Sequence, residues 1–163
     1  MPAVANLAHW SLFFLLSVVL AIASISDIKD RRIPNWSVLA VAVLFVPWAI
    51  TEHVSLASAL GAAAITFVIS CGLYLVGVIG AGDSKLLTAA ALFVGFGQLL
   101  PFLVLVALAG GVIAVMSLAA RPVRALVMFQ MRNKGDFGRG VPYGVAIAIA
   151  TVGILARLFV PIP

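Results

Sequence analysis

The chain has 163 residues and a mass of 17.0 kDa; 64% of its residues are hydrophobic, 9% are charged, and its mean hydropathy is +1.26. A soluble domain carries about 25% charged residues, so this chain has too little polar surface to cover a water-soluble globule. The composition excludes soluble enzymes, secreted disulfide scaffolds, nucleic-acid-binding modules and disordered tails. It predicts an all-α integral membrane protein in which residues 1–163 form a single domain.

Charged residues delimit the membrane spans. The first uncharged run, 1–26, has no Lys or Arg before its apolar core, so we interpret it as a retained span and not as a signal peptide. The run 86–120 would form a helix of about 52 Å, against a hydrocarbon core of about 30 Å. We expect it to break at 95–101, which contains two glycines, a glutamine and a proline. Six helices are predicted, at about 9–26, 35–50, 56–79, 84–97, 101–120 and 141–160.

The basic residues predict the orientation. If the N-terminus is extracytoplasmic, the loops at 27–34, 80–85 and 121–140 face the cytosol and contain nine of the ten Lys and Arg residues. This distribution follows the positive-inside rule and places the C-terminus on the extracytoplasmic side as well. We attribute the net charge of +5 to this cytosolic face and expect no nucleic-acid partner. The loop at 121–140 is either an amphipathic helix on the inner leaflet or an ordinary basic loop.

Few residues offer thiol or metal chemistry. The single cysteine, Cys71, lies in an apolar run and is interpreted as a small buried hydrophobe. His9 and His53 fall on the outer side, where we interpret them as interfacial residues because two histidines alone make a poor metal site. The sequence therefore predicts no metal or other cofactor.

Two acids stand out, because Asp27 directly follows the first predicted span and Asp83 directly follows the third. The predicted topology places both at the same depth on the cytosolic side. An acid in or beside the bilayer is costly, which makes it a functional-site hypothesis by default. Paired carboxyls are the working groups of aspartic proteolysis: the ionised one activates a water, and the protonated one polarises the scissile carbonyl. No nucleophilic Ser or Cys with a general base is evident.

The segments around the acids allow more than one interpretation. Gly80 and Gly82 either leave an unwound strand that pairs with an extended substrate, or form a turn that places Asp83 at the N-terminus of the fourth helix. Asp27 opens a segment that ends in Pro34, which suits the beginning of the second helix. Taken alone, this segment is more simply a basic cytosolic turn.

Three motifs, in this order, resemble those of the type IV prepilin peptidase family of membrane aspartic proteases. They are Asp followed after six residues by Pro-Asn, the GxGDxK form, and a Pro-Tyr-Gly segment that opens the last helix. The matching residues are Asp27, Pro34 and Asn35, then Gly80, Gly82, Asp83 and Lys85, and finally Pro142, Tyr143 and Gly144. The resemblance covers essentially the whole chain. It implies that Asp27 and Asp83 form a catalytic dyad and that the other residues bind substrate or support the site.

The resemblance also implies a substrate, which is a prepilin or pseudopilin with a short basic leader and one hydrophobic helix. Cleavage is expected at the cytosolic face of the bacterial inner membrane. Larger members of the family carry an N-terminal domain with paired zinc-binding cysteines and N-methylate the cleaved pilin. This chain begins with a span and has one cysteine, so no methyltransferase activity is expected. It looks most like the TadV/CpaA-type peptidases of tight-adherence (Flp) pili.

One alternative function and three residue interpretations stay open. The acid pair alone is compatible with a small ion- or proton-coupled transporter, although transporter sites usually lie near the membrane midplane. Asp30 lies one helical turn from Asp27 but does not match the motif. Asp136 is interpreted as a solvated loop charge, and Lys85 as an interface anchor more than as a group acting on Asp83.

Overall fold

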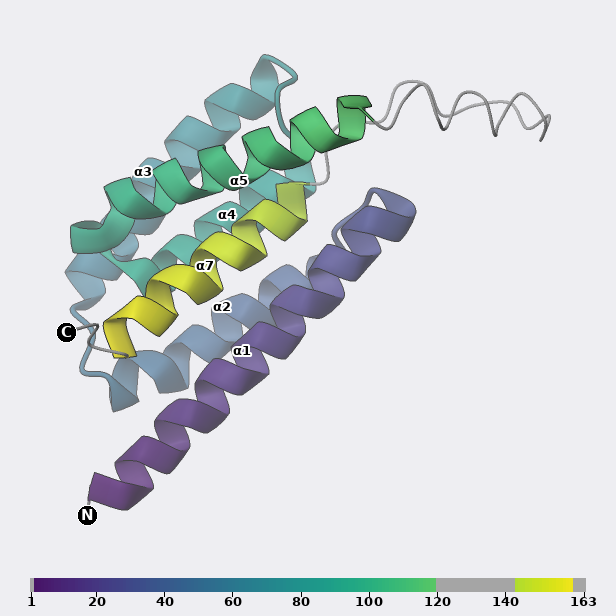
Figure 1. Ribbon diagram of the computed structural model, residues 1–163. Helices are drawn as coiled ribbons and strands as arrows, with labels where there is room; N and C mark the ends of the chain where they lie inside the picture. The colour runs from purple at the N-terminus through teal and green to yellow at the C-terminus, as the bar shows by residue number, and fades with distance from the viewer. Residues whose placement is uncertain (1, 120–142, 160–163) are drawn as a thin grey trace.

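The structure, a computed structural model, describes residues 2–119 and 143–159, so the loop at 121–140 and Pro142 lie outside the described residues. The described ranges contain six α-helices, one short 3-10 helix and no β-strand, which confirms the predicted all-α fold (Figure 1). The helices are α1 (Pro2–Asp30), α2 (Asn35–Thr51), α3 (Leu56–Leu75), α4 (Ala81–Val94), η1 (Phe96–Gln98), α5 (Leu99–Ala119) and α7 (Tyr143–Phe159).

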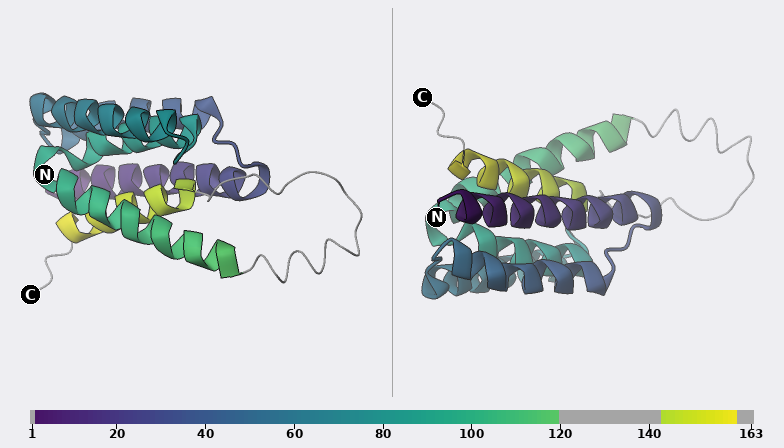
Figure 2. Two further views of the ribbon diagram at one scale, coloured as in Figure 1. Left: turned by 90° about the horizontal axis from the view of Figure 1, so that it is seen from above. Right: turned by 90° about the horizontal axis from the view of Figure 1, so that it is seen from below.

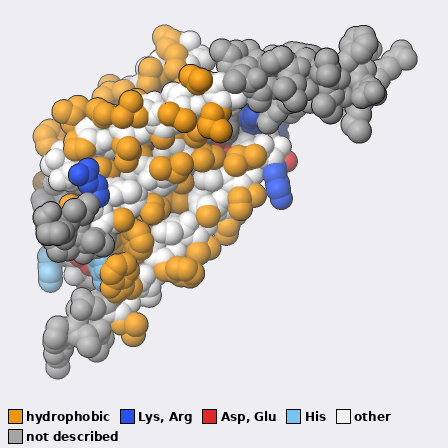
Figure 3. All heavy atoms as spheres, viewed as in Figure 1, with side chains coloured by type: hydrophobic (Ala, Val, Ile, Leu, Met, Phe, Trp, Pro, Cys, Tyr) orange, Lys and Arg blue, Asp and Glu red, His pale blue; other side chains and the backbone are white. Residues whose placement is uncertain are grey.

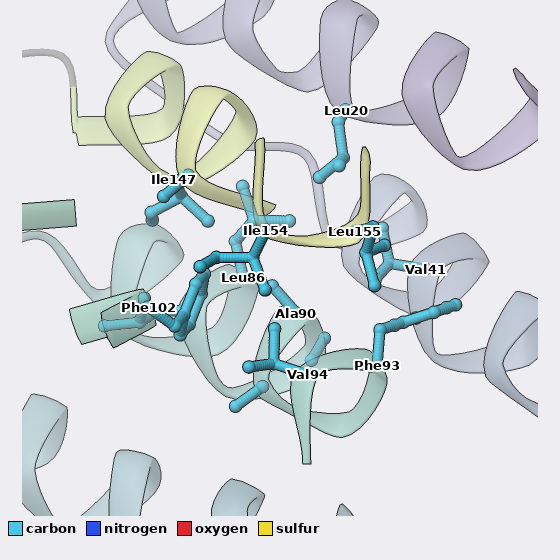
Figure 4. Packing of buried hydrophobic residues seen from close by; sticks show 14 of the residues in the cluster. Leu20, Val41, Leu86, Ala90, Phe93, Val94, Phe102, Ile147, Ile154 and Leu155 are labelled. Atoms are coloured by element: carbon cyan, nitrogen blue, oxygen red, sulfur yellow. The ribbon is translucent and has the colours of Figure 1, made fainter. Parts of the chain in front are cut away.

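Helix α4 is the centre of the bundle. It packs against α2, α3 and α7, whereas α1 packs against α2 and α7, and α5 packs mainly against α7. The buried core is apolar and draws on most of these helices; Leu86 and Phe93 of α4, Val41 of α2 and Leu155 of α7 all belong to it (Figure 4).

The helix ends sort into two groups. Helix α1 begins and α7 ends at one end of the bundle (Figures 1 and 2). The α1–α2 turn, the α3–α4 turn, the end of α5 and the start of α7 lie at the other end. The segments predicted to share one side of the membrane therefore leave the bundle at one end, as far as the structure describes them.

The predicted break in the long apolar run is confirmed. Helix α4 ends at Val94, and Gly95 adopts a φ of +67°, a left-handed conformation that glycine tolerates best. The chain then forms η1, whose first N–H, that of Phe96, donates to the Ser58 hydroxyl at 2.9 Å. Pro101 falls in the first turn of α5, where its missing N–H has no intrahelical partner to lose.

Several helix ends differ from prediction, beginning with α1, which starts at Pro2 instead of residue 9, and α4, which ends at Val94 instead of residue 97. Helix α1 continues to Asp30, past the expected end at 26, because charged residues do not by themselves stop a helix. Arg31, with a φ of +53°, ends it, and its N–H donates to the Asp27 carbonyl. Helix α3 ends at Leu75, short of 79, since Gly77 turns the chain at a φ of +76°. Helix α4 begins at Ala81 instead of residue 84, so both candidate acids lie inside helix ends.

The outer surface suits a lipid environment. Within the described residues, three helices are long and apolar enough to cross a membrane, over Leu7–Asp30, Leu56–Leu75 and Phe96–Ser117, and α2 and α7 are apolar but shorter. Hydrophobic side chains spread across the face formed by α5, α7 and α1, and the charged side chains visible there lie towards the ends of the molecule (Figure 3). The chain is a helical membrane protein.

Two neighbouring glycines test the packing of α5 on α7. A Cβ added at Gly110 would lie 2.7 Å from Cε1 of Tyr143, whereas one added at Gly111 meets no described atom within 4 Å. We expect Gly110→Ala to lower the free energy of unfolding by about 1–3 kcal/mol, because overpacking forces the ring or the helix to move. Gly111→Ala should be neutral or slightly stabilising. Thermal unfolding in detergent measures both, and equal melting temperatures for the two variants would contradict this packing.

Candidate active site

Asp27 and Asp83, which are far apart in the sequence, line one cleft of about 240 Å³. The cleft lies where the α1–α2 turn meets the first turn of α4. Its lining residues are Asp27, Arg31, Arg32, Ile33, Gly80, Ala81, Gly82 and Asp83. The two carboxyl groups are close enough to interact electrostatically, and Arg31 interacts with Asp27 in the same way. The fold therefore brings the two predicted acids together.

A backbone N–H from the last described helix holds Asp27. The side chain lies in the last turn of α1 and is only 5% exposed. Its Oδ2 accepts a hydrogen bond of 2.8 Å from the N–H of Gly144, in the first turn of α7. The first N–H groups of a helix have no intrahelical partner and favour a negative group beside them. The start of α7 is thus the binding partner of this carboxyl.

A side chain at Gly144 would crowd this contact. A Cβ at this position would lie 2.9 Å from Oδ2 and 3.2 Å from Cβ of Asp27. Ser24, one turn earlier on α1, lies with its hydroxyl 3.3 Å from the Gly144 carbonyl oxygen. The same hydroxyl donates to the Leu20 carbonyl at 2.8 Å. Gly144 is therefore in contact with two successive turns of α1.

Asp83 is held by its own helix start. It is the third residue of α4, and its Oδ2 accepts the N–H of Gly80 at 3.1 Å. Its Oδ1 is buried and has no hydrogen-bond partner among the described residues. A buried acceptor left without a partner is costly, and here it belongs to a residue that lines the cleft. This oxygen is therefore an acceptor that no described group of the protein uses.

The two glycines of the GxGD motif permit close approach and do not leave the chain unwound. Gly80 is the N-cap of α4 and Gly82 lies in its first turn, as in the helix-start interpretation. A Cβ on Gly82 would lie 3.1 Å from Cβ of Ile33 in the α1–α2 turn. A Cβ on Gly80 would lie 2.9 Å from Oδ2 of Asp83. Glycine at both positions lets the acid fold back and lets the two motifs meet.

Lys85 joins the first two motifs through a hydrogen bond. Its Nζ donates to Oδ1 of Asn35 at 3.4 Å, and both side chains are exposed. Pro34 is the N-cap of α2, as its motif position predicts. An exposed hydrogen bond of this length contributes little stability, but it links the start of α4 to the start of α2.

The third motif lies beside the cleft. Gly144 contacts Asp27 directly, whereas Tyr143 packs its ring against Gly110 of α5 and so supports the start of α7. Pro142 lies outside the described residues. Neither Tyr143 nor Gly144 is among the residues that line the cleft.

The sequence reasoning missed several contributors. Arg31, Arg32 and Ile33 line the cleft, whereas the sequence pattern accounts for the two arginines by membrane orientation and assigns Ile33 no role in a site. Their position in the segment between Asp27 and Pro34 was the signal that could have found them. No three His, Cys, Asp or Glu side chains in the described part of the chain gather to hold a metal ion.

A second acid–base pair has a structural role. His9 is buried among its neighbours: its Nδ1 pairs with Oε1 of Glu52, and its ring lies 5.3 Å from that of Trp48. The pair links the first half of α1 to the residue that caps the end of α2. It therefore lies at the end of the bundle away from the cleft.

Because Gly144 and Asp27 are in contact, substitutions at the two positions should have non-additive effects on the free energy of unfolding. Gly144→Ala should lower the free energy of unfolding by about 1–3 kcal/mol, because the added methyl group overlaps the carboxyl group. The matched variant Gly153→Ala, whose Cβ would meet Leu105 at 3.5 Å, should be close to neutral. In an Asp27→Ala background, Gly144→Ala should cost less, because two of its three close contacts are gone. Chemical or thermal unfolding measures the cycle, and an equal cost in both backgrounds would show that the two residues do not touch.

Comparison with known proteins agrees with the resemblance read from the motifs. A family model described as the type IV leader peptidase family matches residues 14–115. No curated protein and no solved structure matches. The matched range covers more than half of the chain and contains Asp27, Asp83 and the whole segment between them. The chain belongs to the type IV leader peptidase family.

Proposed function

We propose that this protein is a prepilin leader peptidase in which Asp27 and Asp83 form the catalytic dyad. The observation that supports this most directly is their position: two acids from separate motifs line one cleft in a bundle of apolar helices. Family membership supports a peptidase, and the cleft supplies the pair of carboxyl groups that aspartic proteolysis needs.

The proposed chemistry is hydrolysis of one peptide bond by an activated water. Two neighbouring carboxyls share a proton more readily than both ionise, so we assign the proton to the pair and not to either residue. The ionised carboxyl removes a proton from water while the water oxygen bonds to the scissile carbonyl carbon. The protonated carboxyl donates to the carbonyl oxygen, and a proton then passes to the leaving nitrogen as the C–N bond breaks.

The proposed substrate is a prepilin or pseudopilin with a short basic leader and a hydrophobic helix. The cleft opens at the end of the bundle that carries the α1–α2 and α3–α4 turns, where a leader outside the bilayer would meet a helix inside it. Among family branches, the motif forms are compatible with the TadV/CpaA type of tight-adherence pili. The single cysteine supplies no pair of zinc-binding cysteines, so we propose proteolysis without N-methyl transfer.

A proton- or ion-coupled transporter is the alternative for the same acid pair. Transporter sites usually lie near the midplane of the membrane, at discontinuous helices. Here the acids lie at one end of the bundle, in the last turn of α1 and the first turn of α4. This position favours the peptidase, whose cut falls at a membrane face.

The peptidase proposal requires the cleft to face the cytosol of the bacterial inner membrane. An alkaline phosphatase fused after Pro163 should be active, because the positive-inside distribution places the C-terminus outside the cytosol. A phosphatase fused after residue 79, before the GxGD motif, should be inactive. A green fluorescent protein at the same two positions should give the opposite pattern. A reversed result for either fusion site would contradict the proposed orientation.

Isosteric amides test the dyad. Asp27→Asn and Asp83→Asn keep an oxygen that can accept the Gly144 or Gly80 N–H, so both variants should fold and insert. Each should cleave at least about 100-fold more slowly, because the dyad has lost its shared acid–base function. Co-expression with a Flp-type prepilin, followed by mass measurement of the pilin, reports loss of the leader.

The matched control is Asp30→Asn, which removes an exposed acid one helical turn away and should cleave like the wild type. Wild-type processing by Asp27→Asn or Asp83→Asn would overturn the dyad. An uncut pilin even with the wild type, across a panel of prepilins, would point away from the peptidase and towards ion flux.

A further inference from the structure

A pair of buried hydroxyls lies directly behind the cleft. Oγ of Ser70 on α3 and Oγ of Ser84 on α4 are 2.7 Å apart. Ser70 is completely buried, and Ser84 is 6% exposed. Ser84 is the residue that follows Asp83, so this hydrogen bond joins the helix turn that carries one acid to a neighbouring helix.

Small residues bring α3 and α4 together at this point. The buried positions of α3 recur along one face of the helix and are Ala59, Ala62, Ala63, Thr66 and Ser70. Small side chains let two helix backbones approach closely in a membrane protein. Short side chains such as those of two serines can hydrogen-bond across a helix interface only when the backbones are this near.

Further hydrogen bonds tie Ser70 and Ser84 to their own helices. Ser70 also donates to the Phe67 carbonyl at 3.2 Å, so its oxygen is free to accept from the Ser84 hydroxyl. The Ser84 N–H donates to the Gly80 carbonyl at 3.0 Å, and the Thr88 hydroxyl donates to the Ser84 carbonyl at 2.8 Å. The first turn of α4 is therefore fixed within its own helix and also to α3.

The two acids depend on different helices for their placement. Asp27 is held on α1 by the start of α7, whereas Asp83 is held on α4, which packs most extensively on α3. A displacement of the α4 start relative to α3 would move Asp83 without moving Asp27. Catalytic groups lose much of their effect when misplaced by about 1 Å.

We propose that Ser70 and Ser84 are positioning residues: their hydrogen bond fixes the start of α4 and thereby sets the distance between Asp83 and Asp27. This inference rests on the proposed peptidase function. Neither serine lines the cleft, so neither is a catalytic residue. Thr66 provides a comparison within the same interface, because its buried hydroxyl has no hydrogen-bond partner among the described residues.

The test measures kcat and KM for cleavage of a purified prepilin by full-length protein in nanodiscs. Ser70→Ala and Ser84→Ala should each lower kcat roughly 3- to 20-fold, the range that corresponds to one interhelical hydrogen bond in a membrane protein. KM should stay within about two-fold of the wild type, because substrate-contacting groups are unchanged. The double variant should be no slower than the slower single variant, because both single changes remove the same bond.

Two further measurements separate positioning from general loss of structure. Thr66→Val, an isosteric change that removes an unpartnered hydroxyl from the same face of α3, should keep the wild-type kcat. The pH–rate profile of Ser70→Ala and Ser84→Ala should change in width, because the interaction between the two carboxyls depends on their separation. Partial unfolding would lower the rate but leave the profile unchanged. If one alanine variant does not fold, the other removes the same bond from the opposite helix.

The possible results separate the positioning role of the serines from the peptidase function itself. A lowered kcat with an altered pH profile and a normal Thr66→Val supports the positioning role. Wild-type kcat in both serine variants, an unchanged profile, or multiplicative losses in the double variant would overturn it while leaving the peptidase intact. A wild-type protein that cuts no prepilin would instead overturn the proposed function on which the inference rests.

Discussion

A carboxyl group enclosed by apolar helices needs hydrogen-bond donors, and this bundle supplies them from the backbone at helix starts. The Gly144 N–H of α7 reaches Asp27, and the Gly80 N–H of α4 reaches Asp83. Such N–H groups have no intrahelical partner, and a buried carboxyl needs a donor, so one hydrogen bond satisfies both groups. The helix starts must come very close to the acids, which explains why glycine stands at both positions.

Because each acid is held by a different helix start, two separate pairs of helices position the two acids of the cleft. Asp27 belongs to α1 and is held by α7, while Asp83 belongs to α4, which packs on α3. The α1–α2 turn closes the cleft between them, through Ile33 against Gly82, and the start of α2 adds the contact of Asn35 with Lys85. The dyad therefore depends on how helices from distant parts of the chain are packed together.

Much of this architecture was readable from the residues. Long uncharged runs predicted six helices, and Gly95 with Pro101 predicted the break that separates α4 from α5. The helix ends were less predictable: α1 continues through Asp27 to Asp30, because an acid or a lysine is compatible with a helical turn. The position of Gly77 marked the end of α3, but glycines also occur inside these helices, at Gly61 and Gly72.

The contacts between helices were beyond sequence reasoning. The motifs and the topology predicted that Asp27 and Asp83 meet, and the structure brings both to one cleft. That Gly144 donates to Asp27, or that Ser70 bonds to Ser84, depends on where helix axes cross and how they are rotated. The hydrophobic periodicity shows which face of a helix is buried. It does not show which helix packs against that face or in which register the two helices meet. For the same reason, the packing of His9 against Trp48 and its pairing with Glu52 do not follow from the sequence pattern.

The segment after Asp27 and the segment before Asp83 meet around one cleft. The most direct test is a disulfide between Ile33→Cys and Gly82→Cys in a Cys71→Ser background, formed in native membranes. A Cβ at Gly82 would lie 3.1 Å from Cβ of Ile33, and a disulfide needs Cβ atoms about 3.5–4.5 Å apart, so a small shift suffices. After mild oxidation and denaturation, the pair should resist labelling by a maleimide polymer.

A control pair of Ile33→Cys and Gly72→Cys, with no described atom near Gly72, should label at both thiols. Full labelling of the 33–82 pair would show that the two segments do not meet and would contradict the account.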